Sequence, residues 1–378
     1  MEAALAMRRG IERACPDATI DLCPIADGGE GFLGTLHAAQ GGTLHTLRVT
    51  GPRLEPVEAQ WLSLPPREGE PQTAAIEMAQ ASGLQLLSAA QRDPTLTTTF
   101  GTGQLIAQAI RTGHHRILIG IGGSATTDGG IGMAAALGVQ FFDSQNRNIT
   151  EIPVGRTLSS IDRIDCTAAA TLLQNTQIIA ACDVDNPLTG PRGAAHIYGP
   201  QKGATAAQVL ELDAGLHHLA QRVREQLKED FEAVAGAGAA GGLGFGLLAF
   251  ARASLKPGID LVLDAVRFRE RVAACDLCLT GEGKLDAQSL SGKACIGVAR
   301  AAAEHGVPTI ALVGVSEVTL AQAQQAGLAS YHVIGCGRSR EESMRKASEL
   351  IEVAAEHVVR QHMNIRNAQA KSPHDHRS

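Results

Sequence analysis

Short apolar runs alternate with amphipathic stretches along the chain. Apolar runs typical of strands lie at residues 19–25, 73–79, 116–122, 177–185 and 274–280, and a hairpin is expected around the Gly-Pro turn within 43–64. Helical periodicity covers residues 2–14, 104–113, 130–138 and 205–228, and residues 291–327 alternate helix, strand and helix. This alternation is typical of βαβ units, so the sequence predicts an α/β fold with a parallel sheet.

Length and composition limit the class of protein. A chain of 378 residues with 44% hydrophobic residues favours two globular domains. No linker rich in Ser or Pro separates them, which indicates short crossings, as when one domain is inserted into the other. The polar stretch 363–378 lacks periodicity and is expected to be a disordered tail.

Charge and cysteine content exclude further classes. A net charge of −6 and 3% aromatic residues argue against nucleic-acid binding, although local positive charge can still bind a small acidic molecule. The most apolar stretch, 233–253, is interrupted by glycines and Arg252, and the N-terminus has no signal-peptide core, so no membrane contact is expected. Eight scattered cysteines favour free thiols in a reducing cytoplasm.

A loop rich in glycines and hydroxyls follows the strand at 116–122. Gly122 and Gly123 could present backbone N–H groups to an anion, with hydroxyl donors nearby from Ser124, Thr126 and Thr127. Asp128 could hold Mg²⁺. The run is neither a Walker A motif nor a clean G-x-G-x-x-G, and a plain turn between strand and helix remains an alternative.

The segment 182–204 carries the densest set of polar groups. Asp183 and Asp185, at the end of a strand, suit a general base or a Mg²⁺ ligand, and Asn186 follows them. Arg192 and Lys202 suit anionic oxygens. Turn chemistry explains Asp-Asn-Pro but not the whole set.

Three further segments could complete a site, because ligands of open α/β sheets bind at the carboxyl ends of strands. For each segment the alternative is a purely structural role, as the capped or solvated start of a helix. The candidates are Asp27, Gly28, Gly29 and Glu30 in the first loop, the hydroxyls of Thr98 and Thr99, and the mixed-charge set Glu282, Asp286 and Lys293, with Asp286 a candidate metal ligand.

Glycines for anions, carboxylates for Mg²⁺ and a few cations are the groups that phosphoryl transfer needs, since positioning and charge neutralisation do most of its catalysis. These residues therefore indicate phosphoryl transfer with Mg²⁺ as a cofactor. A nucleotide-dependent oxidoreductase on the same sheet is an alternative, but it lacks a dinucleotide fingerprint.

Five runs resemble those of the type I bacterial glycerate kinases: PIADGGEG, RDPTLTTTFGTG, IGIGGSATTDGGIGMAAALG, CDVDNPLTGPRGAAHIYGPQKGA and LTGEGKLDAQSLSGKACIGVA. The resemblance covers roughly residues 1–360. It implies ATP- and Mg²⁺-dependent phosphorylation of D-glycerate in organic acid catabolism, with 2-phosphoglycerate more expected than 3-phosphoglycerate. A cytoplasmic monomer or homodimer is expected.

The resemblance also implies the domain layout. A flavodoxin-like or Rossmann-like domain, at residues 1–78 and 288–362, would hold a second α/β domain, 79–287, inserted into it. Family members begin with a strand and a loop of the form APDSFKGS, whereas this chain begins at MEAALAMRRGI, inside the helix that follows. We expect the first strand to be missing, and with it stability and activity, because neighbouring backbone groups would lose their partners.

Roles within the site follow from residue type and loop position. Asp183 or Asp185 would be the base or a Mg²⁺ ligand, and Lys293 or Lys202 would neutralise developing charge. The 120–130 loop would hold the phosphates of ATP. A ligand-binding homologue without turnover remains the other alternative.

Overall fold

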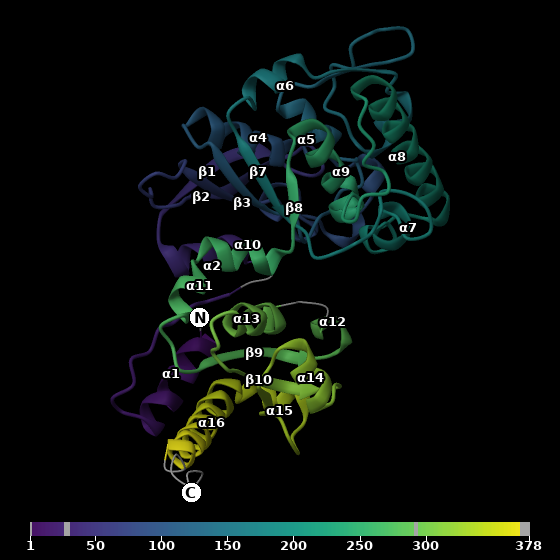
Figure 1. Cartoon of the computed structure of the whole chain (residues 1–378). Helices are drawn as coiled ribbons and strands as arrows, with labels where there is room; N and C mark the ends of the chain where they lie inside the picture. The colour runs from purple at the N-terminus through teal and green to yellow at the C-terminus, as the bar shows by residue number, and fades with distance from the viewer. Residues whose placement is uncertain (1, 26–30, 291–293, 371–378) are drawn as a thin grey trace, which may run out of the picture. The chain divides into compact units, whose positions relative to one another are not determined.

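The computed structural model describes residues 2–25, 31–290 and 294–370, and the chain divides into two compact units (Figure 1). Unit 1 comprises Met1–Ile25 and Val262–Ser378, and unit 2 is the continuous segment Ala26–Leu261. One unit is therefore built from both chain ends, and the other is a single continuous segment. The chain passes from unit 1 to unit 2 after residue 25 and returns after residue 261, whereas the predicted domain boundaries follow residues 78 and 287. Residues 26–78 therefore belong to unit 2, and residues 262–287 belong to unit 1.

A six-stranded mixed sheet forms the centre of unit 2, in the order β1-β2-β3-β4-β7-β8. The hairpin β1–β2 is antiparallel and joins β3 antiparallel, whereas β3, β4, β7 and β8 run parallel. The strands are β1 (Thr43–Thr50), β2 (Pro56–Ser63), β3 (Thr73–Glu77), β4 (Arg116–Gly120), β7 (Gln177–Ala181) and β8 (Ser254–Lys256), with a separate pair β5 (Gln140–Phe142) and β6 (Arg163–Asp165).

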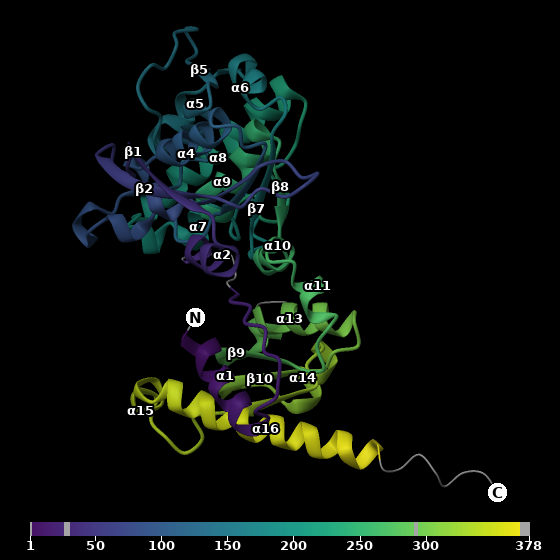
Figure 2. The same cartoon turned by 90° about the vertical axis from the view of Figure 1, so that its left-hand side faces the viewer.

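Helices of unit 2 connect these strands (Figure 2). They are α2 (Phe32–Gln40), α3 (Ala79–Ser82), α4 (Phe100–Arg111), α5 (Ile131–Ala136), α6 (Thr167–Leu172), α7 (Ala194–Tyr198), α8 (Ala206–Leu227) and α9 (Ala239–Ala251), while α10 (Gly258–Ala265) contains the division between the units.

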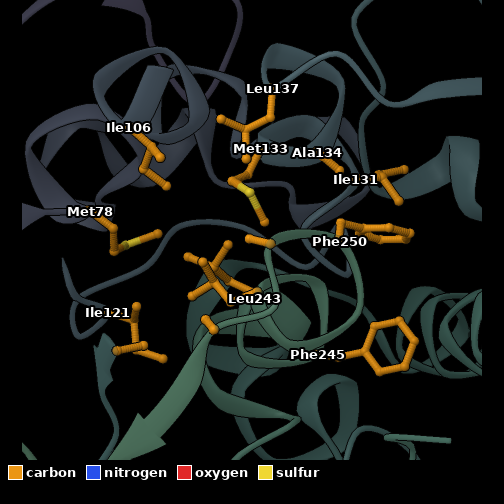
Figure 3. Packing of buried hydrophobic residues seen from close by; sticks show 14 of the residues in the cluster. Met78, Ile106, Ile121, Ile131, Met133, Ala134, Leu137, Leu243, Phe245 and Phe250 are labelled. Carbon is orange, nitrogen blue, oxygen red and sulfur yellow. The ribbon is translucent and has the colours of Figure 1, made fainter. Parts of the chain in front are cut away.

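Both faces of β3, β4 and β7 are buried, which explains their continuous apolar runs. Ile117 and Ile119 of β4 belong to the main core, and Leu118 between them is buried on the other face. Helices α4, α5 and α9 supply much of that core. Figure 3 shows Leu243 of α9 among side chains that include Met133 of α5. The core fixes the backbone from which the loops at the strand ends depart.

Unit 1 holds a three-stranded parallel sheet, β11-β10-β9, with helix α1 packed along α16 (Figure 2). Its strands are β9 (Cys278–Leu285), β10 (Thr309–Ser316) and β11 (Ser330–Val333), and its helices are α1 (Glu2–Ala14), α11 (Phe268–Val272), α12 (Ala287–Leu290), α13 (Ala294–Ala303), α14 (Leu320–Ala326), α15 (Arg340–Arg345) and α16 (Ala347–Ala370). The α/β class with parallel strands is confirmed.

Three expected elements differ. Residues 19–25 form no strand, because their backbone has no ladder partner in the described part of the chain; Arg271 instead donates to the Leu22 carbonyl and pairs with Asp21. The expected loop after residue 280 is part of β9, whose backbone pairs with β10 through Leu285. Helix α16 continues to Ala370, so residues 363–370 are helical instead of disordered, while 371–378 lie outside the described residues.

No helix in the described ranges has both the length and the apolar character needed to cross a membrane.

Candidate functional site

The candidate site of unit 2 lies where β4 and β7 end side by side. Gly120 pairs with Ala181 in the parallel ladder, so the two following loops leave the sheet at adjacent positions. Between them lies a cavity of about 290 Å³. It is lined by Leu84, Ile121, Gly122, Gly123, Ser124, Ala181, Cys182, Asp183, Val184, Tyr198, Gln201, Lys202, Ala239 and Ala240. The carboxyl ends of adjacent parallel strands are the usual place for a ligand in such sheets.

Asp128 holds the 120–130 loop in place from behind the cavity. Its side chain is fully buried, and Oδ2 accepts hydrogen bonds from the Thr99 N–H at 2.7 Å, the Thr99 hydroxyl at 2.8 Å and the Gly132 N–H at 3.3 Å. Oδ1 accepts from the Gly130 N–H at 3.1 Å. Burial raises the pKa of this carboxyl, and the hydrogen bonds oppose that rise. The loop and the start of α4 are thereby fixed to each other.

Lys202 joins the two loops of the cavity. Its ammonium donates to the Ser124 hydroxyl at 2.8 Å and to the Thr126 carbonyl at 2.6 Å, and the side chain is only 2% exposed. The short turn Pro200–Lys202 that carries it ends at Gly203, whose φ of +96° suits glycine and which packs against the Arg92 carbonyl. A buried cation is thus presented beside a glycine-rich loop.

Burial sets the protonation of this cation. Loss of hydration lowers the pKa of the Lys202 ammonium to about 7 from its ordinary 10.5, while the negative charge of Asp128 acts in the opposite direction. An anion placed in the cavity would favour the charged form further, because opposite charges at short distance in a poorly solvated site interact strongly. The geometry therefore suits an anionic ligand.

Asp183 provides the exposed carboxylate of the cavity wall. Its Oδ1 accepts the Gly258 N–H at 2.7 Å, which orients the side chain at the end of β7. The polar residues that follow, Asp185, Asn186 and Arg192, do not line the cavity. We call them its rim because Asn186 accepts a hydrogen bond from the lining residue Tyr198. Asp185 pairs with Arg192 at 2.9 Å with both side chains mostly exposed, and Asn186 joins the Arg192 carbonyl to the Tyr198 hydroxyl.

The structure sorts the predicted site residues into three groups. Gly122, Gly123, Ser124, Asp183 and Lys202 line the cavity. Asp185, Asn186 and Arg192 form its rim, and Thr98, Thr99, Thr126, Thr127 and Asp128 are fully buried behind it. The hydroxyl oxygens of Thr126 and Thr127 have no hydrogen-bond partner among the described residues.

Two of the remaining predicted residues belong to unit 1, and five lie outside the described residues. Glu282, within β9, and Asp286, which accepts the Ser289 N–H at 3.1 Å and lies 3.5 Å from Lys284, belong to unit 1. Asp27, Gly28, Gly29, Glu30 and Lys293 lie outside the described residues. Their predicted roles stay predictions.

Sequence reasoning missed several members of the cavity. Tyr198 is one of only two tyrosines and stands within the 182–204 segment, so its rarity was an available signal. Ala239 and Ala240 lie in the run GAGAAGGLGFG, which reads as a helix start but contributes a wall. Glu77, which does not line the cavity, is a further unpredicted buried carboxylate: at the end of β3 and 5% exposed, it accepts the Gly31 and Leu33 N–H groups at the start of α2.

Mg²⁺ fits this donor set only as a partner of a bound phosphate. The described residues contain no group of three or more His, Cys, Asp or Glu side chains able to hold a metal ion. Mg²⁺ is commonly held by one or two carboxylates together with substrate phosphates and waters. The exposed Asp183 carboxylate meets that requirement.

Comparison with known proteins decides the family. The model of the glycerate kinase family matches residues 1–363. The chain belongs to the glycerate kinase family. The resemblance drawn from the motifs is confirmed, and membership of a kinase family implies phosphoryl transfer from ATP.

Curated relatives span nearly the whole chain. It is 43% identical to a glycerate kinase of Halalkalibacterium halodurans over 95% of this chain and 93% of that protein, and 45% identical to a glycerate 2-kinase of Escherichia coli over 83% and 81%. A crystal structure assigned to glycerate kinase 2 of Salmonella typhimurium LT2 matches with a TM-score of 0.84 at 38% identity, covering 98% of this chain and 95% of that one.

Proposed function

We propose that this protein transfers the γ-phosphoryl group of ATP to the 2-hydroxyl of D-glycerate and forms 2-phosphoglycerate. The observation that carries the proposal is one cavity that combines a glycine-rich loop, the buried Lys202 ammonium and the Asp183 carboxylate. Relatives of the same length named glycerate kinase support the substrate, and the glycerate 2-kinase of Escherichia coli supports the position of transfer.

Each wall of the cavity has a role in this reaction. The Gly122–Ser124 loop would bind phosphate oxygens through its N–H groups and the Ser124 hydroxyl. Lys202 would balance the negative charge on the transferring group, which in phosphoryl transfer is spread over three oxygens. The protein chiefly positions the reactants and neutralises their charge.

Asp183 is the better choice of the two candidate bases. It lines the cavity, whereas Asp185 is paired with Arg192 at the rim. We assign to Asp183 acceptance of the proton from the attacking hydroxyl. Mg²⁺, when bound with ATP, would reduce the negative charge of the phosphate oxygens. A loss of activity in D183N that excess Mg²⁺ reverses would instead assign Asp183 to the metal.

A coupled assay of ADP formation with D-glycerate, ATP and Mg²⁺ tests the function, with L-glycerate as the matched control. ³¹P and ¹³C NMR of the product then identify the phosphorylated hydroxyl. The expected result is D-glycerate-dependent ADP release with phosphate on the 2-oxygen. NADH oxidation without ADP would support an oxidoreductase, glycerate binding without turnover would support a binding homologue, and phosphate on the 3-oxygen would overturn the assigned position.

A further inference from the structure

The start of α9 has an unusual backbone. Ala239 is right-handed helical, but Ala240 has φ 53° and ψ 37°, and Gly241 and Gly242 are also left-handed, with φ 70° and 87°. Left-handed backbone is unfavourable for a residue with a Cβ, so Ala240 keeps this conformation only because its surroundings impose it. The reason lies in the packing of this turn.

The loops that follow β4 and β7 both contact this turn. The Gly241 carbonyl accepts the Gly129 N–H at 3.1 Å, and a Cβ on Gly241 would collide with the carbonyl oxygen of Thr126. On the other side the Gly238 N–H donates to the Asn186 carbonyl at 3.0 Å. The turn is therefore a rigid part of the cavity, held between the loops that follow β4 and β7.

Two consecutive backbone donors of the turn are unused. The N–H groups of Ala240 and Gly241 have no acceptor among the described residues, whereas the Ala239 N–H donates to the Gly236 carbonyl and the Gly242 N–H donates to the Gly238 carbonyl at 3.4 Å. A right-handed residue followed by a left-handed one turns successive N–H groups toward a common point, which forms an anion-binding concavity.

The Lys202 ammonium in the same cavity also favours an anionic ligand. Lys202 lines the cavity together with Ala239 and Ala240 and is 2% exposed. Its ammonium has three N–H donors, of which only those to Ser124 and Thr126 have acceptors in the described part of the chain. A buried cation with a donor to spare thus lines the same open cavity of about 290 Å³ as Ala240, and the unused Gly241 N–H is the next donor along the chain.

We propose that the turn at Ala239–Gly241 is a phosphate-binding wall of the cavity, its Ala240 and Gly241 N–H groups donating to an anionic phosphate oxygen that Lys202 also contacts. This inference rests on the proposed function for the identity of the phosphate. It adds to the predicted 120–130 loop a second set of backbone donors. The turn is pre-formed, so its donors need no rearrangement when the phosphate arrives.

Amide NMR of the full chain tests the wall directly. The protein is labelled with ¹⁵N-glycine and ¹⁵N-alanine and titrated with ADP and Mg²⁺, and adenosine with Mg²⁺ is the matched probe without phosphates. The Ala240 and Gly241 amides are expected to move downfield with ADP and not with adenosine. Gly244 and Gly246 of the same helix do not line the cavity and are the internal controls.

A matched pair of variants tests whether the ligand beside Ala240 is negatively charged. Asp and Asn both tolerate left-handed backbone, so A240D and A240N preserve the turn and differ only in charge. We expect ADP to bind A240D about 10-fold or more weakly than A240N, because a carboxylate would lie beside the bound phosphate. Equal affinities would contradict the inference.

The NMR titration and the ADP-release assay can fail independently, so the phosphate-binding wall and the proposed kinase activity are tested separately. If Gly122 and Gly123 respond to ADP while Ala240 and Gly241 do not, the wall is wrong and the kinase can still be right. If Ala240 and Gly241 respond but no glycerate-dependent ADP release occurs, the wall stands and the proposed function fails. The absence of any response from cavity amides at saturating ADP would also overturn the wall.

Discussion

The Lys202 ammonium lies 2.6 Å from the carbonyl oxygen of Thr126, at 2% exposure, and this bond ties the segment after β7 to the loop after β4. Burying a lysine costs stability unless its charge is balanced. The protein retains such a lysine beside a cavity, where a cation is useful for binding anions. A group that weakens the fold and faces a ligand volume is a candidate for function.

Replacing Lys202 with Met should separate activity from stability. We expect kcat/KM for ATP to fall by about 10²–10³-fold, because one charge-stabilising donor is lost. The free energy of unfolding at pH 7 should change by less than about 2 kcal/mol, since the lost hydrogen bonds and the removed cost of burying a cation offset each other. Trp61, the only tryptophan and a buried residue of unit 2, reports urea unfolding of that unit.

The control is Lys228→Gln, which removes a surface ammonium from the same unit. It should leave both measurements within error. If K202M retained the kcat/KM of the unchanged protein, the assigned role of Lys202 would be wrong.

Stability of unit 2 should depend on pH through the same lysine. Burial lowers the Lys202 pKa to about 7, so between pH 7 and 10.5 the unfolded chain binds more protons than the folded one. Stability contributed by this group therefore rises with pH across that window, by up to about 5 kcal/mol, and the burial penalty is fully present below pH 7. Urea unfolding followed by Trp61 fluorescence at pH 7, 8.5 and 10 should show a steeper rise in the unchanged protein than in K202M. Parallel profiles would contradict this account.

Much of the fold was predictable because apolar periodicity reports burial directly. The helix 2–14, the hairpin of β1 and β2, and the buried runs of β3, β4 and β7 are where the pattern placed them. The strand predicted at 19–25 was wrong because an apolar run shows burial but not a backbone partner, and the Leu22 carbonyl accepts from Arg271 instead. Pairing is a tertiary property that local pattern does not contain.

The site was predictable in its loops and less so in its individual residues. Residue type identified Lys202 and Asp183, but not that Asp185 turns to Arg192 or that Asp128 is wholly occupied by N–H and O–H donors. The wall at Ala240 was missed because backbone donors leave no side-chain signature. The only sequence signal for an unusual turn at Ala240 was the pair of glycines that follows it, Gly241 and Gly242.

Asp128→Asn should destabilise unit 2 more than Thr99→Val. All four partners of the carboxylate are donors, so an amide NH₂ must face at least one N–H or O–H group in either orientation. We expect a loss of about 2–4 kcal/mol for D128N and about 1–2 kcal/mol for T99V, measured by urea unfolding with Trp61 fluorescence. Equal losses would show that the carboxylate acts only through Thr99.

Asp183→Asn and Asp185→Asn form the sharpest pair for the chemistry, because the two residues stand two positions apart in one loop. D183N should lower kcat for D-glycerate by about 10²–10⁴-fold, the usual effect of losing a positioned base. D185N breaks only an exposed pair with Arg192, worth about 0–1 kcal/mol, and should keep kcat within a few-fold. Steady-state ADP release gives both values, and circular dichroism checks that each variant is folded. The reverse order, with D185N inactive and D183N active, would move the base to the rim and require Arg192 to swing away during the reaction.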